Sequence, residues 1–247
     1  METNVSDADV KMLERDGAPA LAFRKRDGAL PALVFLSGYA SDMEGAKAQA
    51  IDAFGASRGL CALRFDYSGT GASQGRFEDG MLNDWLADSL AMIAAQTEGP
   101  LILIGSSMGG WLALHIALRM PERVAGIVGI AAAPDFTEWG FDAAQRAELE
   151  ATGRLGEEGR YFTREFWKSG QRMLLLGSEI ACDCPVRLVH GDADSDVPLA
   201  IAERLIGKLR SADVQLTIVK GGGHRLSEPH EIQAILRTVD SLLEPSP

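Results

Sequence analysis

The chain has 247 residues, of which 46% are hydrophobic and 24% are charged, and it carries a formal net charge of −11. That length suits one large α/β domain, and the composition supplies enough apolar side chains for a full core. The acidic balance excludes nucleic acids and anionic membranes as partners, because both repel an acidic surface. No run approaches the roughly 20 apolar residues of a membrane span, so we expect none.

Neither a targeting signal nor a metal motif is expected. Residues 1–15 contain several acids and no apolar stretch, so they resemble neither a signal peptide nor a basic transit peptide. The three cysteines, Cys61, Cys182 and Cys184, lack the spacing of a zinc or redox motif. We therefore expect a reduced, cytoplasmic protein without a metal or an organic cofactor, as a monomer or a small homo-oligomer.

Apolar runs alternate with longer amphipathic segments from residue 32 onward, which is typical of βα units around a mostly parallel sheet with helices on both faces. An antiparallel hairpin from part of Val10–Arg15 and from Leu21–Arg24 is expected at the sheet edge. The expected strands are Ala32–Leu36, Cys61–Phe65, Leu101–Gly105, Val124–Ile130, Val186–His190 and Val214–Val219. The expected helices are Gly45–Ala56, Met81–Gln96, Gly109–Met120, Leu199–Leu209 and Pro229–Leu243.

One interval interrupts this alternation. Residues 135–182 are too many for an ordinary loop and include several Phe and Trp residues. Because long insertions in such folds are often lids, we expect a single α/β domain over residues 1–247 with a small helical cap at residues 135–182. The alternative is an irregular surface excursion that its aromatic side chains anchor.

A Gly-x-Ser-x-Gly motif marks the strand-to-helix turn that exposes a nucleophilic serine, and the sequence contains three matches. The match at residues 55–59 precedes a strand, and the match at residues 71–75 lies in a loop. Only the match at residues 105–109 follows a buried strand and opens a helix. This context predicts that Ser107 is the nucleophile, with a helix N-terminus beside it.

The chain has four histidines, so the catalytic base can be sought by elimination. His115 lies inside an apolar helix, His190 ends a strand, and His230 lies in a first helical turn. His224 follows three glycines after the last strand, where a mobile imidazole can serve both nucleophile and leaving group. His224 is therefore the predicted base.

The acid that orients the imidazole is less determined by the residues themselves. Asp192, Asp194 and Asp196 share the loop after the next-to-last strand, and Asp135 follows the strand before it. Physical reasoning alone does not rank these four.

Two backbone N–H groups are expected to form an oxyanion hole. Met108 follows the nucleophile, and Tyr39 lies in the loop after the first parallel strand. Tyr39 could equally be only a wall of the pocket.

At these residues the sequence resembles the α/β-hydrolase superfamily over nearly its whole length. The shared features are the nucleophile turn, a terminal Gly-x-His224 and the loop His190-Gly191-x-x-Asp194-x-x-Val197-Pro198, and this resemblance assigns the acid to Asp194. The sequence is also similar to the family of mitochondrial α/β-hydrolase-domain protein ten. The matching segments are Ser37-Gly38-Tyr39-x-Ser41-x-Met43-x-Gly45-x-Lys47-Ala48, Arg64-Phe65-Asp66-Tyr67-Ser68-Gly69 and Gly105-Ser106-Ser107-Met108-Gly109-Gly110-Trp111. That resemblance implies hydrolysis of palmitoyl-protein thioesters and acyl glucuronide esters.

The predicted function is hydrolysis of small-molecule or protein-linked acyl esters and thioesters through an acyl-enzyme. Aromatic side chains of the cap and its surroundings would suit an apolar acyl group, or would merely pack the cap on the sheet. The candidates for this pocket are Trp111, Phe136, Trp139 and Trp167. Arg225, beside His224, is expected to be a solvated arginine rather than a partner of an anionic substrate group. The alternative function is a non-catalytic ligand-binding protein of the same fold.

Overall fold

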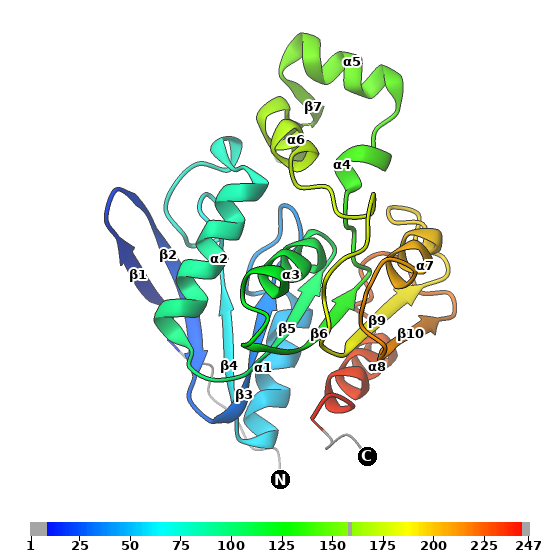
Figure 1. Cartoon of the computed structure of the whole chain (residues 1–247). Helices are drawn as coiled ribbons and strands as arrows, with labels where there is room; N and C mark the ends of the chain where they lie inside the picture. The colour runs from blue at the N-terminus through cyan, green and yellow to red at the C-terminus, as the bar shows by residue number, and fades with distance from the viewer. Residues whose placement is uncertain (1–8, 158–159, 244–247) are drawn as a thin grey trace.

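An eight-stranded sheet forms the centre of the computed structural model, which describes residues 9–157 and 160–243 (Figure 1). The strand order is β1-β2-β4-β3-β5-β6-β9-β10. The first two strands form the predicted antiparallel hairpin at one edge, and β3, β4, β5, β6, β9 and β10 run parallel. The strands are β1 (Lys11–Arg15), β2 (Ala18–Arg26), β3 (Ala29–Leu36), β4 (Leu60–Phe65), β5 (Leu101–Ser106), β6 (Val124–Ile130), β9 (Val186–Gly191) and β10 (Val214–Val219).

Helices cover both faces of this sheet, which confirms the predicted fold class. The residues that alternate along each strand pack into two different cores: Val34 and Leu103 face one, and Leu33 and Ile102 face the other. The first core includes residues of α2 (Leu82–Gln96), α3 (Met108–Arg119) and α7 (Leu199–Ile206). The second includes residues of α1 (Ala46–Arg58) and α8 (Pro229–Asp240). Coverage on both faces explains why the strands are nearly continuous runs of apolar residues.

Residues 135–182, which we call the cap segment, connect β6 to β9. The helices of this segment lie above the end of the sheet where β6 finishes, and the chain after residue 171 descends beside the sheet toward β9 (Figure 1). The segment contains α4 (Phe136–Trp139), α5 (Ala143–Thr152) and α6 (Arg164–Gln171). It also contains a small antiparallel sheet of β7 (Arg154–Glu157) and β8 (Arg160–Thr163), which the sequence did not predict. Strands of four residues with charged members are too short to show a periodic apolar pattern.

Several predicted boundaries differ from the observed ones. The helix expected to reach Leu209 ends at Ile206, before Gly207, and the last helix ends at Asp240 rather than Leu243. A 3-10 turn, η1 (Phe77–Asp79), precedes α2. None of the helices in the described part of the chain has the length and hydropathy of a membrane span. The prediction about targeting signals falls partly on residues 1–8, which lie outside the described residues.

Candidate active site

Ser107 occupies the tight turn between β5 and α3, with φ 53° and ψ −116°. Two glycines make this turn possible. A Cβ on Gly105 would lie 2.3 Å from the carbonyl oxygen of Gly109, and a Cβ on Gly109 would lie 2.1 Å from that of Leu36. Backbone atoms cannot yield at such distances, so the strained serine is held by close backbone packing on both sides.

His224 connects this serine to a buried carboxylate. Its Nε2 lies 3.1 Å from Ser107 Oγ, and its Nδ1 lies 2.9 Å from Asp194 Oδ2. The Asp194 side chain is fully buried, whereas that of His224 is 21% exposed. A proton on Nδ1 that bonds Asp194 leaves Nε2 free to accept the hydroxyl proton of Ser107, which is the arrangement general-base catalysis requires.

Asp194 is held as an anion by its surroundings. Burial by itself would raise its pKa, but the hydrogen bond with His224 and two backbone N–H groups together lower the pKa below its usual value. These donors are the N–H groups of Asp196 and Val197, each 2.9 Å from Oδ1. A permanent negative charge behind His224 can stabilise the imidazolium that forms when Ser107 loses its proton.

The other candidate acids lie elsewhere. Asp192 and Asp196 are exposed at the surface of the same loop. Asp135 is fully buried but accepts hydrogen bonds from the N–H groups of Leu175 and Leu176, where it fastens the end of the cap segment. The structure thus brings only Asp194 to His224 among the four.

The other three histidines lie in positions that suit structural or surface roles. His190 is buried with Nε2 2.9 Å from the carbonyl oxygen of Val197, so it supports the loop that carries Asp194. His115 Nε2 lies 2.9 Å from the carbonyl oxygen of Met173. His230 is exposed on α8.

Two backbone N–H groups near Ser107 are available as oxyanion donors. In residues 9–157 and 160–243, neither Tyr39 N nor Met108 N donates a hydrogen bond within the protein. Met108 is the first residue of α3, where N–H groups lack partners and the helix dipole favours negative charge. The loop of Tyr39 passes beside the nucleophile, since a Cβ on Gly38 would lie 3.4 Å from Ser107 Cβ. Their role in catalysis stays a prediction.

A cavity of about 500 Å³ opens beside Ser107. Its walls come from the loop and first turn after β3, the nucleophile turn and the segment around His224. Lys47 and Arg225 line it, and Lys47 was named above only as part of a segment that matches the family, without a role in the site. The Lys47 amine donates a hydrogen bond to the carbonyl oxygen of Arg225, 178 residues away, and burial lowers its pKa. No local sequence signal could have revealed a contact across that separation.

The structure does not place the four predicted pocket aromatics on this cavity. Trp111 is fully buried, and its indole N–H donates to the carbonyl oxygen of Met173 at 3.1 Å. Trp139 and Trp167 donate to the carbonyl oxygens of Pro134 and Thr137. Phe136 packs against Phe162 and Phe166 of the cap segment. Packing of the cap, the alternative role for these side chains, is therefore what the structure shows.

No metal centre accompanies the triad: the described residues contain no group of three or more His, Cys, Asp or Glu side chains that could hold an ion. The contacts among Ser107, His224 and Asp194 have the chemistry of a proton relay that starts from a hydroxyl.

Comparison with known proteins agrees with this geometry. Residues 29–161 match the sequence model of the family described as serine aminopeptidase, S33. The human palmitoyl-protein thioesterase ABHD10, mitochondrial, is 37% identical over 245 residues, which cover 95% of this chain and 80% of that protein. The mouse protein of the same name is 36% identical over 247 residues, covering 96% of this chain and 83% of that protein.

Solved structures extend the comparison. The mouse α/β-hydrolase domain-containing protein 10 superposes with a TM-score of 0.91 at 36% identity, covering 96% of this chain and 98% of that one. Est1E from Butyrivibrio proteoclasticus, solved with ferulic acid, has a TM-score of 0.80 at 20% identity and covers 94% and 97%, a likeness of fold alone. The chain therefore belongs to the α/β-hydrolase family and is a serine hydrolase related to ABHD10.

Proposed function

We propose that this protein hydrolyses acyl thioesters and carboxylic esters through an acyl-enzyme formed on Ser107. The observation that carries the proposal is the unbroken chain of contacts from Ser107 Oγ through His224 to the buried carboxylate of Asp194, with distances of 3.1 and 2.9 Å. Membership of the α/β-hydrolase family supports the same chemistry.

The geometry suits two half-reactions. In the first, His224 Nε2 takes the hydroxyl proton while Ser107 Oγ attacks the substrate carbonyl, and the tetrahedral oxyanion accepts hydrogen bonds from Tyr39 N–H and Met108 N–H. The imidazolium then gives its proton to the leaving thiol or alcohol. In the second, His224 takes a proton from a water molecule that attacks the acyl-enzyme carbonyl. The bond from the acyl carbon to Ser107 Oγ then breaks, the imidazolium returns its proton to Oγ, and the carboxylic acid leaves. Asp194 keeps the imidazole in one orientation throughout.

The relatives support a proposal for the substrate class. They are named palmitoyl-protein thioesterases, so we propose long-chain acyl thioesters, including protein-linked ones, as substrates of this chain. The cavity beside Ser107 has polar and apolar walls, and Lys47 and Arg225 stand on it. Acyl esters whose leaving group bears a negative charge, such as acyl glucuronides, form the second substrate class that these two cations favour.

A matched substrate panel tests this proposal. The wild-type chain and Ser107→Ala are compared on p-nitrophenyl esters and acyl thioesters from C2 to C16. The expected result is turnover by the wild type that increases toward long thioesters and disappears in the variant. Preference for short oxyesters would instead make the protein a general carboxylesterase. Equal inertness of both chains, with acyl ligands still bound, would support the non-catalytic binding protein.

The compartment and the assembly are separate proposals. Cys61, Cys182 and Cys184 are free thiols, which supports a reducing compartment such as the cytoplasm, whereas the relatives are named mitochondrial. Fractionation of cells that express the native chain would distinguish the two. We propose a monomer or small homo-oligomer, which light scattering of the purified chain would test.

A further inference from the structure

Tyr39 connects the candidate oxyanion hole to the cap segment. Its loop lies beside Ser107, while its hydroxyl donates a hydrogen bond to the carbonyl oxygen of Tyr161 in β8 at 2.7 Å. Its ring stacks on Phe162 with 4.5 Å between centroids and lies 4.7 Å from Phe166. One residue therefore places its backbone at the nucleophile and its side chain among residues of the cap segment.

The hydroxyl of Tyr39 is a lasting donor. Burial, reinforced by Tyr161, raises its pKa well above the usual value for a phenol. The group therefore keeps its proton at neutral pH. The hydrogen bond to Tyr161 therefore links the loop to β8 while the cap is docked.

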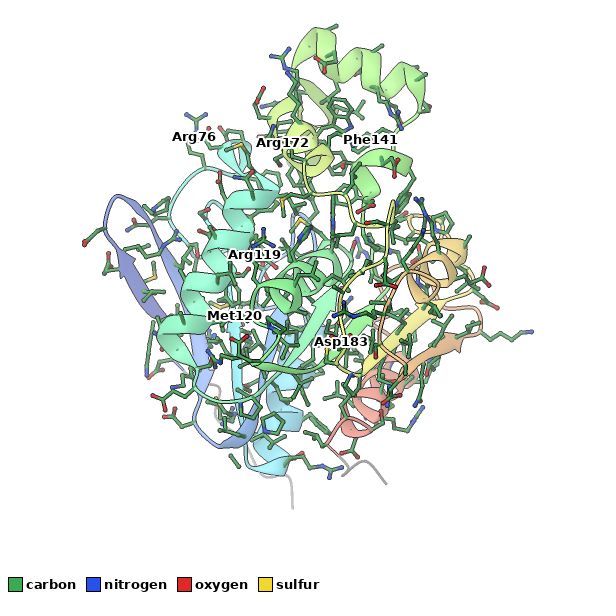
Figure 2. All side chains as sticks on the ribbon, viewed as in Figure 1. Arg76, Arg119, Met120, Phe141, Arg172 and Asp183 are labelled. Atoms are coloured by element: carbon green, nitrogen blue, oxygen red, sulfur yellow. The ribbon has the colours of Figure 1, made fainter. Side chains whose placement is uncertain are left out.

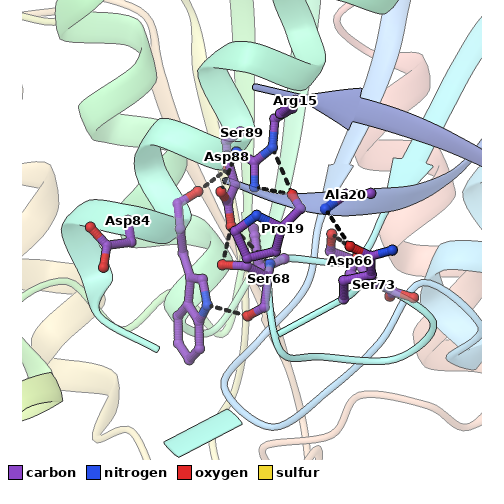
Figure 3. Close-up of polar contacts among 12 residues, drawn as sticks. Arg15, Pro19, Ala20, Asp66, Ser68, Ser73, Asp84, Asp88 and Ser89 are labelled. Atoms are coloured by element: carbon purple, nitrogen blue, oxygen red, sulfur yellow. Dashed lines mark hydrogen bonds and ion pairs between the residues drawn. The ribbon is translucent and has the colours of Figure 1, made fainter. Parts of the chain in front are cut away.

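Residues outside the cap segment also contact the Tyr39 ring. Phe77 and Trp85 contact the ring at centroid distances of 5.2 and 5.8 Å. Trp85 Nε1 donates to the carbonyl oxygen of Ser68 at 3.0 Å. Ser68 in turn donates to Asp88, which also bonds Arg15 at 2.6 Å (Figure 3). This network ties α2 to the loop after β4 and to β1.

The backbone of the loop needs external support. Ala40 has φ 54°, in the left-handed region that side chains with a Cβ avoid. Such a conformation persists only where surrounding contacts enforce it. The ring of Tyr39 contacts Phe162 and Phe166 of the cap segment. Figure 2 draws the side chains of this segment above the body of the protein. We attribute the support of the Ala40 backbone to these contacts of the neighbouring Tyr39 with the cap segment.

We propose that Tyr39 is a positioning residue: its hydrogen bond to the carbonyl oxygen of Tyr161 and its stacking on Phe162 together couple docking of the cap to the geometry of the oxyanion hole. With the cap docked, the Tyr39 N–H stays beside Ser107, where the oxyanion forms. Displacement of β8 frees the ring and lets the loop relax, which withdraws one of the two donors. The inference rests on the proposed function and adds to it that hydrolysis is efficient only under a docked cap.

The test compares Tyr39→Phe, which deletes only the hydroxyl, with Tyr161→Phe, which deletes a neighbouring hydroxyl but keeps the acceptor carbonyl. Each chain is assayed for kcat and KM on a p-nitrophenyl ester and for inhibition by an acyl trifluoromethyl ketone, whose hemiketal mimics the oxyanion. In Tyr39→Phe, kcat is expected to fall about tenfold, less than the loss of a whole oxyanion donor would cause. The ketone affinity should weaken by the same factor, whereas KM and the pH profile stay unchanged because His224 and Asp194 are intact. Tyr161→Phe should match the wild type.

Each outcome decides between separate claims. If Tyr39→Phe keeps wild-type kcat and ketone affinity while Ser107→Ala is inactive, the coupling is wrong and the proposed function stands. If the wild type itself is as inert as Ser107→Ala, the proposed function fails and the coupling fails with it. If Tyr39→Phe does not fold, Phe162→Leu, which keeps the hydrogen bond and trims the stacking, decides: a smaller fall in kcat and ketone affinity supports the coupling, and no change overturns it.

Discussion

Two properties of single residues determine whether the site can react: the charge of Asp194 and the backbone of Ser107. Asp194 is fully buried with three hydrogen-bond donors within 2.9 Å, so its carboxylate is both ionised and fixed. Ser107 has φ 53°, a conformation that costs about 1–3 kcal/mol in a residue with a Cβ. The strain at Ser107 favours reaction over stability, whereas the lowered pKa of Asp194 also stabilises the fold at neutral pH.

Replacement of Asp194 by Asn should lower kcat by about 10³-fold to 10⁴-fold, because an amide no longer holds the imidazole in the required tautomer or stabilises its cation. KM should change little, since Asp194 has no exposed surface to meet substrate. Steady-state kinetics on a p-nitrophenyl ester would measure both. Asp196→Asn is the matched control, because the exposed Asp196 side chain does not contact His224. Equal losses in the two variants would contradict the assignment.

Replacement of Ser107 by Gly should relieve the backbone strain that Ser107→Ala retains. The free energy of unfolding of Ser107→Gly is therefore expected to exceed that of Ser107→Ala by about 1 kcal/mol, because glycine adopts positive φ at no steric cost. Urea denaturation of the two inactive variants would measure the difference. A Ser107→Gly chain that is less stable than Ser107→Ala would show that the turn is not strained.

The sequence predicts roles for Ser107 and His224 because each has a local signature, the strand–turn–helix context of the one and the glycines before the other, and the structure places the two side chains in contact. The acid lacked such a signature, since Asp192, Asp194 and Asp196 alternate in one loop and only the family resemblance ranked them. The structure distinguishes them by burial, which depends on how the loop folds back onto His190 and Val197. Lys47 was missed for a similar reason, because its partner lies on a distant segment.

At the level of elements, α3 has two functions. Its N-terminus presents Met108 beside the nucleophile, and its middle fastens the end of the cap segment. Trp111 and His115, one turn apart, both bond the carbonyl oxygen of Met173. A carbonyl has two lone pairs, so this pair of donors satisfies it fully. The helix that follows the nucleophile thus also anchors the covering segment.

The anchor at His115 predicts a pH dependence of stability. Burial lowers the pKa of His115 from 6.5 to about 4, although the bond to Met173 opposes the shift. The unfolded chain therefore binds this proton at higher pH than the folded chain does. Its contribution is complete above pH 6.5 and is lost as the pH falls toward 4, by about 3 kcal/mol in total.

Urea denaturation of the wild type and His115→Gln between pH 7 and pH 4.5 would test this prediction. The fall in the free energy of unfolding with decreasing pH should be shallower in the variant, which has no imidazole to protonate. His230→Gln, which removes an exposed imidazole, serves as the control and should follow the wild type. Parallel curves for the wild type and His115→Gln would show that His115 does not remain neutral in the fold.

The elements themselves could be predicted to different degrees. The buried parallel strands were recognisable because coverage on both faces makes them continuous apolar runs, as β5 illustrates with every residue buried. The β7–β8 pair was not, since its two strands of four residues pair through contacts within the cap segment rather than through a periodic pattern of their own. The contact of Trp111 with the cap segment likewise left no local signal in the sequence. Its indole N–H donates to the carbonyl oxygen of Met173, which helps to anchor the cap segment on α3.

In the molecule as a whole, the parallel sheet explains how distant residues meet. Ser107 and His224 are 117 positions apart, and Asp194 is 30 positions from His224. Each follows a parallel strand, β5, β9 or β10, and the carboxyl ends of these strands lie at one edge of the sheet. The cap segment lies over that same edge (Figure 1). The fold therefore assembles nucleophile, base and acid without any of the three being near another in sequence.

The role of Ser107 as the nucleophile can be tested by covalent labelling followed by intact-mass and peptide mass spectrometry. The chain is treated with a long-chain alkyl fluorophosphonate, which reacts only with an activated serine. Ser227→Ala and Ser57→Ala are the controls, the first removing another serine of the cavity and the second the serine of a rival Gly-x-Ser-x-Gly match. If Ser107 is the nucleophile, we expect one adduct, located on Ser107, which persists in both controls and is absent from Ser107→Ala. An adduct that persists in Ser107→Ala, or a wild-type chain that remains unlabelled, would contradict the assignment of Ser107 as the nucleophile.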